Sequence, residues 1–196
     1  MIQSANINKD IAKRTITGLV LMTVFTLSWA GIAYYGLMNT SYWWAVSIFP
    51  IASIFFIYYA IQMLKVAKHL PMAEAEDRDL AKKKGRIFGI ICTGEGIGIA
   101  ILVNLVTMLH HPELRVPAIA LAVGLHFFPL GMLFKRKMDY YLGIWSTGIA
   151  LLAIFLTLDH ELTKTMMMAF TGIGLALATT YYGIHMVFAT RRALAI

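Results

Sequence analysis

Apolar and polar positions alternate in long blocks along this chain, and the apolar blocks have the length of membrane-spanning helices. A helix needs about 20 mostly apolar residues to cross a bilayer, and six such stretches remain when the chain is divided at its polar breaks. The six predicted spans cover residues 15–38, 42–64, 87–109, 116–134, 140–158 and 165–189. The pattern predicts an all-α fold, an integral membrane bundle of six transmembrane helices that forms one domain over residues 1–196.

Basic residues are distributed unequally between the two sides of this predicted bundle. Fifteen of the 17 Lys and Arg residues lie in the two tails and in the second and fourth connections, whereas only Arg115 and Lys164 lie on the opposite side. Lys and Arg in short loops remain on the cytoplasmic side during insertion. We therefore expect a multi-pass protein of the cell inner (plasma) membrane, with both termini and a connecting loop at 67–86 in the cytoplasm.

Composition narrows the classes of function. Hydrophobic residues make up 59% of the chain, so the predicted spans use nearly all of it and an enzyme is less expected than a non-enzymatic membrane protein. The net charge of +7 is explained by the basic side of the bundle, which favours anionic lipid headgroups as partners and gives no reason to expect nucleic acid. The single cysteine, Cys92, excludes a disulfide framework within the chain.

The even-numbered spans share a short pattern near their predicted cytoplasmic ends, in which a small residue and an aliphatic residue precede Gln or His. This pattern suggests three repeated helical hairpins inserted in the same orientation, as parallel repeats are in some transporters. Chance similarity between apolar helices is the alternative. The three copies are Ala60-Ile61-Gln62, Gly124-Leu125-His126 and Gly183-Ile184-His185.

Four polar side chains at similar depth in the predicted spans are the candidate ligand- or proton-binding residues: Glu95, His126, His185 and Gln62. Glu95 and His126 each lie nine residues from the nearest basic residue at the cytoplasmic side, or about 13 Å along a helix. An ionisable group in hydrocarbon costs a few kcal/mol and usually faces protein or water. We therefore expect these side chains to face the bundle interior as one polar layer.

Glycines flank Glu95 in the sequence Thr93-Gly-Glu-Gly-Ile-Gly98. Their lack of side chains allows another helix to approach Glu95 closely, and Gly94 and Gly98 form the GxxxG spacing found at helix contacts in membranes. The same spacing leaves room for a homo-oligomer. A carboxyl beside an imidazole can exchange a proton with it, whereas the simpler interpretation is a hydrogen bond that only holds two helices together.

Histidines on different helices also raise the alternative of a bound haem or metal. His126 and His185 lie on the fourth and sixth predicted spans, and His110, His111 and His160 lie at the opposite rim and form a second candidate group. The chain has no CxxCH motif for covalent haem attachment, and no cofactor is predicted from its motifs.

The segment Gly124-Leu-His-Phe-Phe-Pro-Leu130, followed by a basic turn and another span, resembles a G-x-H-F-F/L-P element of uncharacterised bacterial multi-span membrane proteins. The resemblance covers about 30 residues. It implies a bacterial plasma-membrane protein and brings no activity or ligand with it.

These patterns leave three functions open. The leading hypothesis is a transporter or channel for a proton-linked or small solute, with Glu95, His126 and His185 as the central polar site. The second is a membrane redox or metal-binding protein that uses the histidines, and the third is a non-catalytic membrane subunit.

Overall fold

The computed structural model describes residues 9–71 and 75–194 of the chain, and this part is entirely helical apart from its connections. Six of its helices are long and apolar enough to cross a membrane, as the sequence predicts. Two short 3-10 helices, Trp43–Ser47 and Pro112–Leu114, precede the second and fourth. The long helices are α1 (Lys9–Leu37), α2 (Ile48–Ala67), α3 (Ala75–Met108), α4 (Arg115–Phe134), α5 (Lys137–Leu158) and α6 (Lys164–Leu194).

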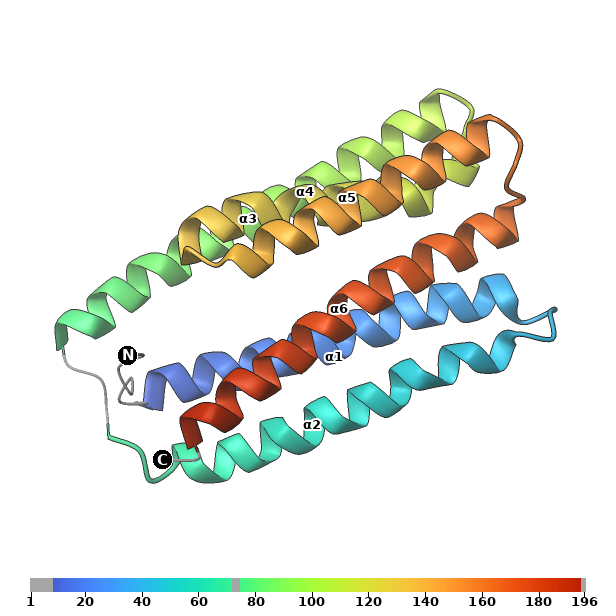
Figure 1. Cartoon of the computed structure of the whole chain (residues 1–196). Coiled ribbons are helices and arrows are strands. Elements are labelled where there is room, and N and C mark those ends of the chain that lie inside the picture. Colours follow the sequence, from blue (N-terminus) through green and yellow to red (C-terminus); the bar gives the residue numbers. More distant parts are fainter. Residues whose placement is uncertain (1–8, 72–74, 195–196) are drawn as a thin grey trace.

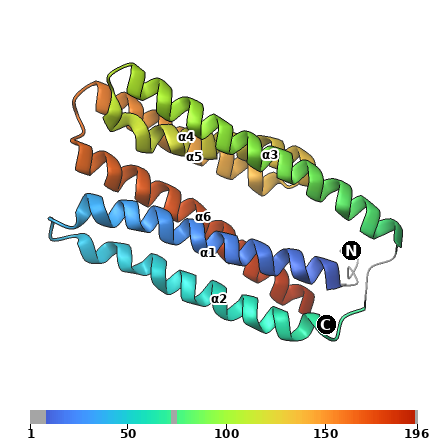
Figure 2. The same ribbon diagram turned by 180° about the vertical axis from the view of Figure 1, so that it is seen from behind.

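The six helices form two groups of three, as the two opposite views in Figures 1 and 2 show. In one group α1 lies between α6 and α2, and in the other α4 lies between α3 and α5. Contacts of α6 with α5 join the two groups. Helix α3 lies at the edge of its group and packs mainly on α4.

The start of α1, the ends of α2 and α6, the start of α3 and the α4–α5 turn, with the residues beside them, all lie at the same end of the bundle (Figure 1). These are the segments that hold 15 of the 17 basic residues. The fold therefore concentrates positive charge at one end, as the expected cytoplasmic side requires. The orientation of this end in a membrane stays a prediction.

Small residues bring α1 and α6 into close contact. A Cβ atom placed on Gly172 would lie 2.5 Å from the backbone nitrogen of Ala33, and one on Gly36 would lie 2.5 Å from that of Ala169. A hydrogen bond of 2.9 Å from Thr26 to Thr179 also crosses this contact. Close backbone approach with hydroxyl bonds between helices is typical of membrane bundles, where helix association gains little from the hydrophobic effect.

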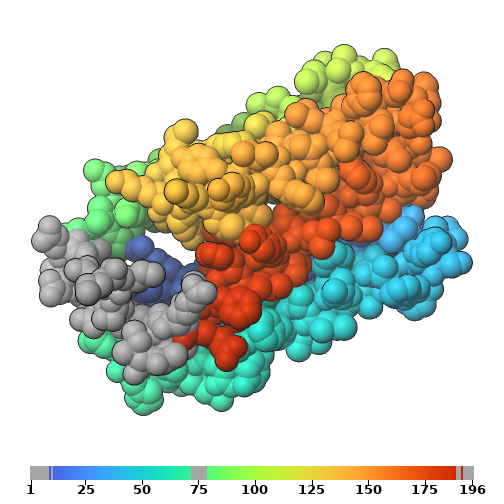
Figure 3. Space-filling model, in the orientation of Figure 1, coloured from blue at the N-terminus to red at the C-terminus, as the bar shows by residue number. Residues whose placement is uncertain are grey.

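Helices α4 and α5 use the same principle. Gly124 of α4 lies against the backbone of Thr147, and Gly131 lies against the ring of Tyr140. The turn between these helices is tight because Lys135 has a left-handed backbone with φ of 54°. Figure 3 shows one long face of the resulting bundle, with α5 beside α6 and α6 beside α2.

The predicted loop at 67–86 is too long. Helix α2 extends to Ala67, and α3 begins at Ala75 rather than near residue 87. The sequence from Ala75 to Lys84 consists mostly of good helix formers, and the pair Asp79 and Lys83 has the acid-before-base spacing that supports a helix. Residues 72–74 lie outside the described residues.

The three-hairpin repeat stays a prediction. Helices α1 and α2 pack against each other, as do α3 and α4, but α5 packs mainly along α4 and α6 mainly along α1. The third expected hairpin is thus divided between the two groups. The bundle consequently consists of two groups of three helices rather than three separate hairpins.

Candidate functional site

Glu95 and His126 come together at the contact between α3 and α4. Oε1 of Glu95 lies 3.5 Å from Nδ1 of His126, and the two side chains are 13% and 10% exposed. The same Nδ1 lies 2.6 Å from the backbone carbonyl oxygen of Val123. Because a carbonyl oxygen only accepts, Nδ1 is the donor in that bond and carries a proton. The other ring nitrogen, Nε2, is then the atom at which His126 gains or loses a proton.

An open groove of about 340 Å³ runs along this contact. Gly94, Gly98 and Ala122 contribute little side-chain volume to its walls, so the Glu95 and His126 side chains are reachable from it. Pro129 also lines the groove and has no N–H, which leaves the carbonyl of Leu125 without its helical partner. The groove thus combines a carboxyl and an imidazole within largely apolar walls.

One hydroxyl group of α5, that of Thr147, lies close to the backbone of Gly124, two residues before His126. Thr147 Oγ1 would lie 2.6 Å from a Cβ atom on Gly124, and its neighbour Ser146 is fully buried. Neither hydroxyl has a hydrogen-bond partner within the described part of the chain. Residues two apart on a helix face different sides, so the Thr147 hydroxyl lies at the α4–α5 contact, separate from the Glu95–His126 contact between α3 and α4.

A second polar cluster lies at the basic end of the bundle, around Asp139 in the first turn of α5. This carboxylate is completely buried, accepts a hydrogen bond of 2.8 Å from the hydroxyl of Tyr182 and accepts one of 3.1 Å from Nε of Arg136. The guanidinium of Arg136 also lies 4.6 Å from the ring centre of Phe134 and 5.8 Å from that of Tyr182. The cluster ties the α4–α5 turn to α6.

Asp139 is also close enough to His126 to interact with it electrostatically, although no hydrogen bond or ion pair joins the two among the described residues. Sequence reasoning missed Asp139 and Tyr182 as candidate residues. Arg136 and Asp139 are an oppositely charged pair three residues apart at a helix start, and this signal could have identified half of the cluster. The contribution of Tyr182 depends on how α6 crosses α5.

The other two candidate residues do not join this site. The expectation that His185 faces the bundle interior is wrong, because its side chain is exposed. On this part of α6 the buried side is formed by Tyr182, Gly183 and Val187, which turns His185 outwards. Gln62 is partly buried on α2 and has no hydrogen bond to any described residue.

The outer histidines do not assemble into a metal site. Nδ1 of His111 lies 2.8 Å from Oε1 of Glu113, and His160 is close enough to Glu113 to interact with it electrostatically. His110 and His160 have left-handed backbones at the ends of α3 and α5. Within residues 9–71 and 75–194, no group of three His, Cys, Asp or Glu side chains has an arrangement that could hold a metal ion.

Comparison of the chain with protein-family models, with curated proteins and with solved structures finds no match. The site must therefore be judged by its own chemistry. A carboxyl and an imidazole in an open groove within the spans can bind and exchange protons, and an apolar groove with a few polar groups can accept a small polar solute.

Proposed function

We propose that this chain is a small membrane transporter or channel for protons, or for a small solute whose movement is linked to protons. The observation that supports the proposal best is the position of the Glu95–His126 pair. Its atoms are 3.5 Å apart, they lie within two helices able to span a bilayer, and an open groove reaches them. Ionisable residues at such depth commonly mark ion and proton pathways.

The proposed roles follow from the geometry. The Nδ1–H of His126 donates to the carbonyl of Val123, so Nε2 is the atom that binds and releases protons. Glu95 provides the negative charge that holds a proton or a cationic solute beside the ring.

Proton flux into proteoliposomes tests the proposal without knowledge of a solute. The full-length protein is reconstituted with a trapped pH-sensitive dye, and a potassium diffusion potential drives proton entry. We expect flux well above that of protein-free liposomes, loss of this flux in Glu95→Gln, and a strong reduction in His126→Gln. Gln retains hydrogen-bonding capacity in both positions but cannot exchange a proton at neutral pH.

His185→Gln is the matched control for His126→Gln, because His185 is an exposed histidine outside the site. Its flux should equal that of the unaltered protein. Flux equal to protein-free liposomes in the unaltered protein, or undiminished flux in a Glu95→Gln, His126→Ala double variant, would contradict proton transport by this pair. A lowered thermal stability of Glu95→Gln with unchanged flux would instead assign the pair a structural role.

We also propose that the basic end of the bundle is cytoplasmic and that the membrane is the plasma membrane. Single cysteines can be placed in a Cys92→Ser background at Lys83 of the basic end and at Glu161 of the opposite end. An impermeant thiol reagent added to intact cells should label the cysteine at position 161 and leave that at position 83 unlabelled. The reverse labelling pattern would show that the orientation is wrong.

A further inference from the structure

The glycines of α3 have no role in the packing of this chain. At Gly89, Gly94 and Gly96, an added Cβ atom would meet no other atom within 4 Å. By contrast, Gly36, Gly124 and Gly172 each lie against the backbone of a neighbouring helix. Glycine in the middle of a helix costs about 1 kcal/mol relative to alanine. The open glycines of α3 are therefore unexplained by contacts within the chain.

The exposed face of α3 carries two adjacent rows of residues. The first row repeats with the alternating three- and four-residue spacing of a helix–helix seam, and it is rich in β-branched side chains. The second row, formed by Gly89, Thr93, Gly96 and Ala100, has small or medium-sized side chains and is equally exposed. The first row consists of Ile87, Ile90, Gly94, Ile97 and Ile101, and Asn104 lies between the two rows because it follows Ile101 by three residues and Ala100 by four.

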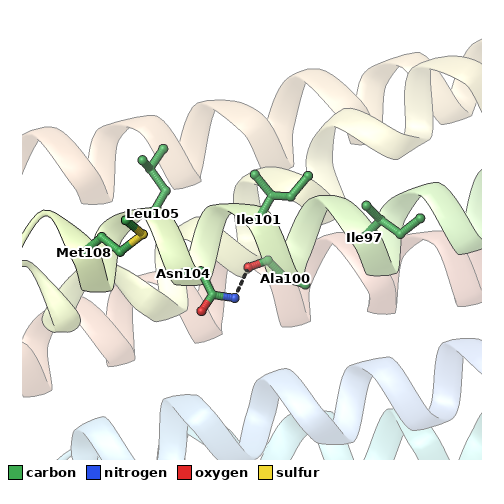
Figure 4. Close-up of a pocket in the computed structure, with 6 residues that line it drawn as sticks. All are labelled: Ile97, Ala100, Ile101, Asn104, Leu105 and Met108. Carbon is green, nitrogen blue, oxygen red and sulfur yellow. Dashed lines mark hydrogen bonds between the residues drawn. The ribbon is translucent and has the colours of Figure 1, made fainter.

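Asn104 adds a polar group to this outward face. It lies within the apolar span Asp79–Met108, and its amide nitrogen donates to the carbonyl of Ala100 at 2.7 Å (Figure 4). Its amide oxygen has no partner among the described residues. Around it, Ile97, Ile101 and Met108 are 56%, 61% and 77% exposed and line a shallow hollow with Ala100. In a bilayer this amide oxygen needs a donor that hydrocarbon cannot supply.

We propose that the outward face of α3 is the surface through which two copies of this chain associate side by side in the membrane. A second copy fits this face for three reasons. An amide contains both a donor and an acceptor, so two Asn104 side chains can pair across a twofold axis. Identical chains with the same orientation place both Asn104 residues at the same depth. The isoleucine row of one α3 fits the small row of the other, which makes the surface self-complementary, as a twofold interface must be.

This association would also affect the Glu95 groove. Gly94 belongs both to the first row on the outward face and to the lining of that groove. A second α3 packed over Gly94 would therefore stand at the edge of the groove and narrow its access from the lipid. The proposal does not depend on the transport function, because it rests on the shape and polarity of α3 alone.

Cysteine cross-linking in native membrane vesicles tests the surface. In full-length chains with Cys92→Ser, single cysteines replace Ile90, Ile97 and Asn104 in turn, and Ile54 of α2 and Ile144 of α5 provide equally exposed controls (68% and 62%). Oxidation should yield disulfide-linked dimers at the three α3 positions and not at the controls. Stronger cross-linking at the controls than on α3, or cross-linking of α3 only to a different protein, would overturn the proposal.

The size of the purified protein in lipid nanodiscs or lipid-diluted vesicles provides a second measurement. Gly96→Ile should abolish the dimer because it fills the small row, whereas Gly148→Ile, which also faces open space but on α5, should leave it intact. Asn104→Leu should raise the dissociation constant of the dimer about 3- to 30-fold, the range expected for loss of a hydrogen bond between membrane helices. An unaltered protein that stays monomeric at every protein-to-lipid ratio would refute the dimer.

Discussion

Helices α3 and α6 resemble each other in length and in glycine content but differ in their surroundings. They contain 34 and 31 residues, and both combine apolar side chains with several glycines. In the most apolar part of α6, 61% of the residues are buried inside the protein, compared with 0% in α3. Gly172, Gly174 and Gly183 of α6 each lie against a neighbouring residue, whereas Gly89 and Gly96 of α3 face open space. The presence of glycines in a helix therefore does not by itself show that the helix packs closely against another helix of the same chain.

The largest effect expected from this contrast concerns a glycine on each helix. A Cβ atom at Gly172 would lie 2.5 Å and 2.8 Å from backbone atoms of Ala33 and Trp29, which cannot move aside. Gly172→Leu should therefore cost more than about 3 kcal/mol or prevent folding. Gly96→Leu should keep or slightly raise stability, by up to about 1 kcal/mol, because leucine is the better helix former.

Thermal unfolding in detergent, followed by tryptophan fluorescence, measures both variants under conditions that keep the protein monomeric. Equal destabilisation by the two substitutions would mean that α3 is as tightly packed within the chain as α6. That outcome would remove the contrast between the two helices, together with the basis for a dimer.

The second comparison concerns the two buried acids. Asp139 is fully buried and accepts bonds from Tyr182 and Arg136, whereas Glu95 has one contact at 3.5 Å and retains 13% exposure. Asp139→Asn removes the charge that balances Arg136 and should cost about 2 kcal/mol. Glu95→Gln should change the stability by less than about 0.5 kcal/mol, as expected for a weak polar contact. Thermal unfolding midpoints of the two variants measure this difference. A larger decrease in the midpoint for Glu95→Gln than for Asp139→Asn would show that the Glu95–His126 contact between α3 and α4 contributes more to stability than the Asp139 cluster.

A smaller effect is expected from the hydroxyl that joins α6 to α5. Tyr182→Phe leaves the ring in place but removes the 2.8 Å bond to Asp139, which should cost about 1–2 kcal/mol. The adjacent Tyr181 is 60% exposed, so Tyr181→Phe is the matched control and should have almost no effect on the unfolding midpoint. Equal midpoints for the two variants would show that the Asp139 cluster contributes little to the contact between the two helical groups.

The number of helices could be predicted from the sequence, and the reason is physical. A span in a bilayer must satisfy its backbone hydrogen bonds internally and must be long and apolar, so it leaves a strong signal in hydropathy and length. The start of α3 was placed near residue 87 because residues 75–86 are charged and lie outside the apolar span, although their helix-forming composition does not depend on the membrane.

The candidate site could be predicted only in part. Glu95 and His126 were found because each is ionisable within an apolar helix, and the structure brings them together. The same signal failed for His185, because position along a helix determines depth but not the direction in which a side chain points. Asp139 and Tyr182 were missed because their contact links residues 43 positions apart on helices that differ in tilt and rotation.

The smallest effect concerns the hydrogen bond that crosses from α1 to α6. Thr26 donates to Thr179 at 2.9 Å, whereas Thr93 of α3 donates only to the carbonyl of Gly89 on its own helix. Hydrogen bonds between membrane helices average about 0.6 kcal/mol. Thr26→Val should therefore lower the free energy of unfolding by about that amount, whereas Thr93→Val should leave it unchanged. In a Thr26→Val, Thr179→Val double variant, the loss of unfolding free energy should not exceed the sum of the losses in the two single variants, because both substitutions remove the same hydrogen bond. A loss from Thr93→Val as large as that from Thr26→Val, measured on the monomer in detergent, would mean that the outward face of α3 has a polar contact within the chain.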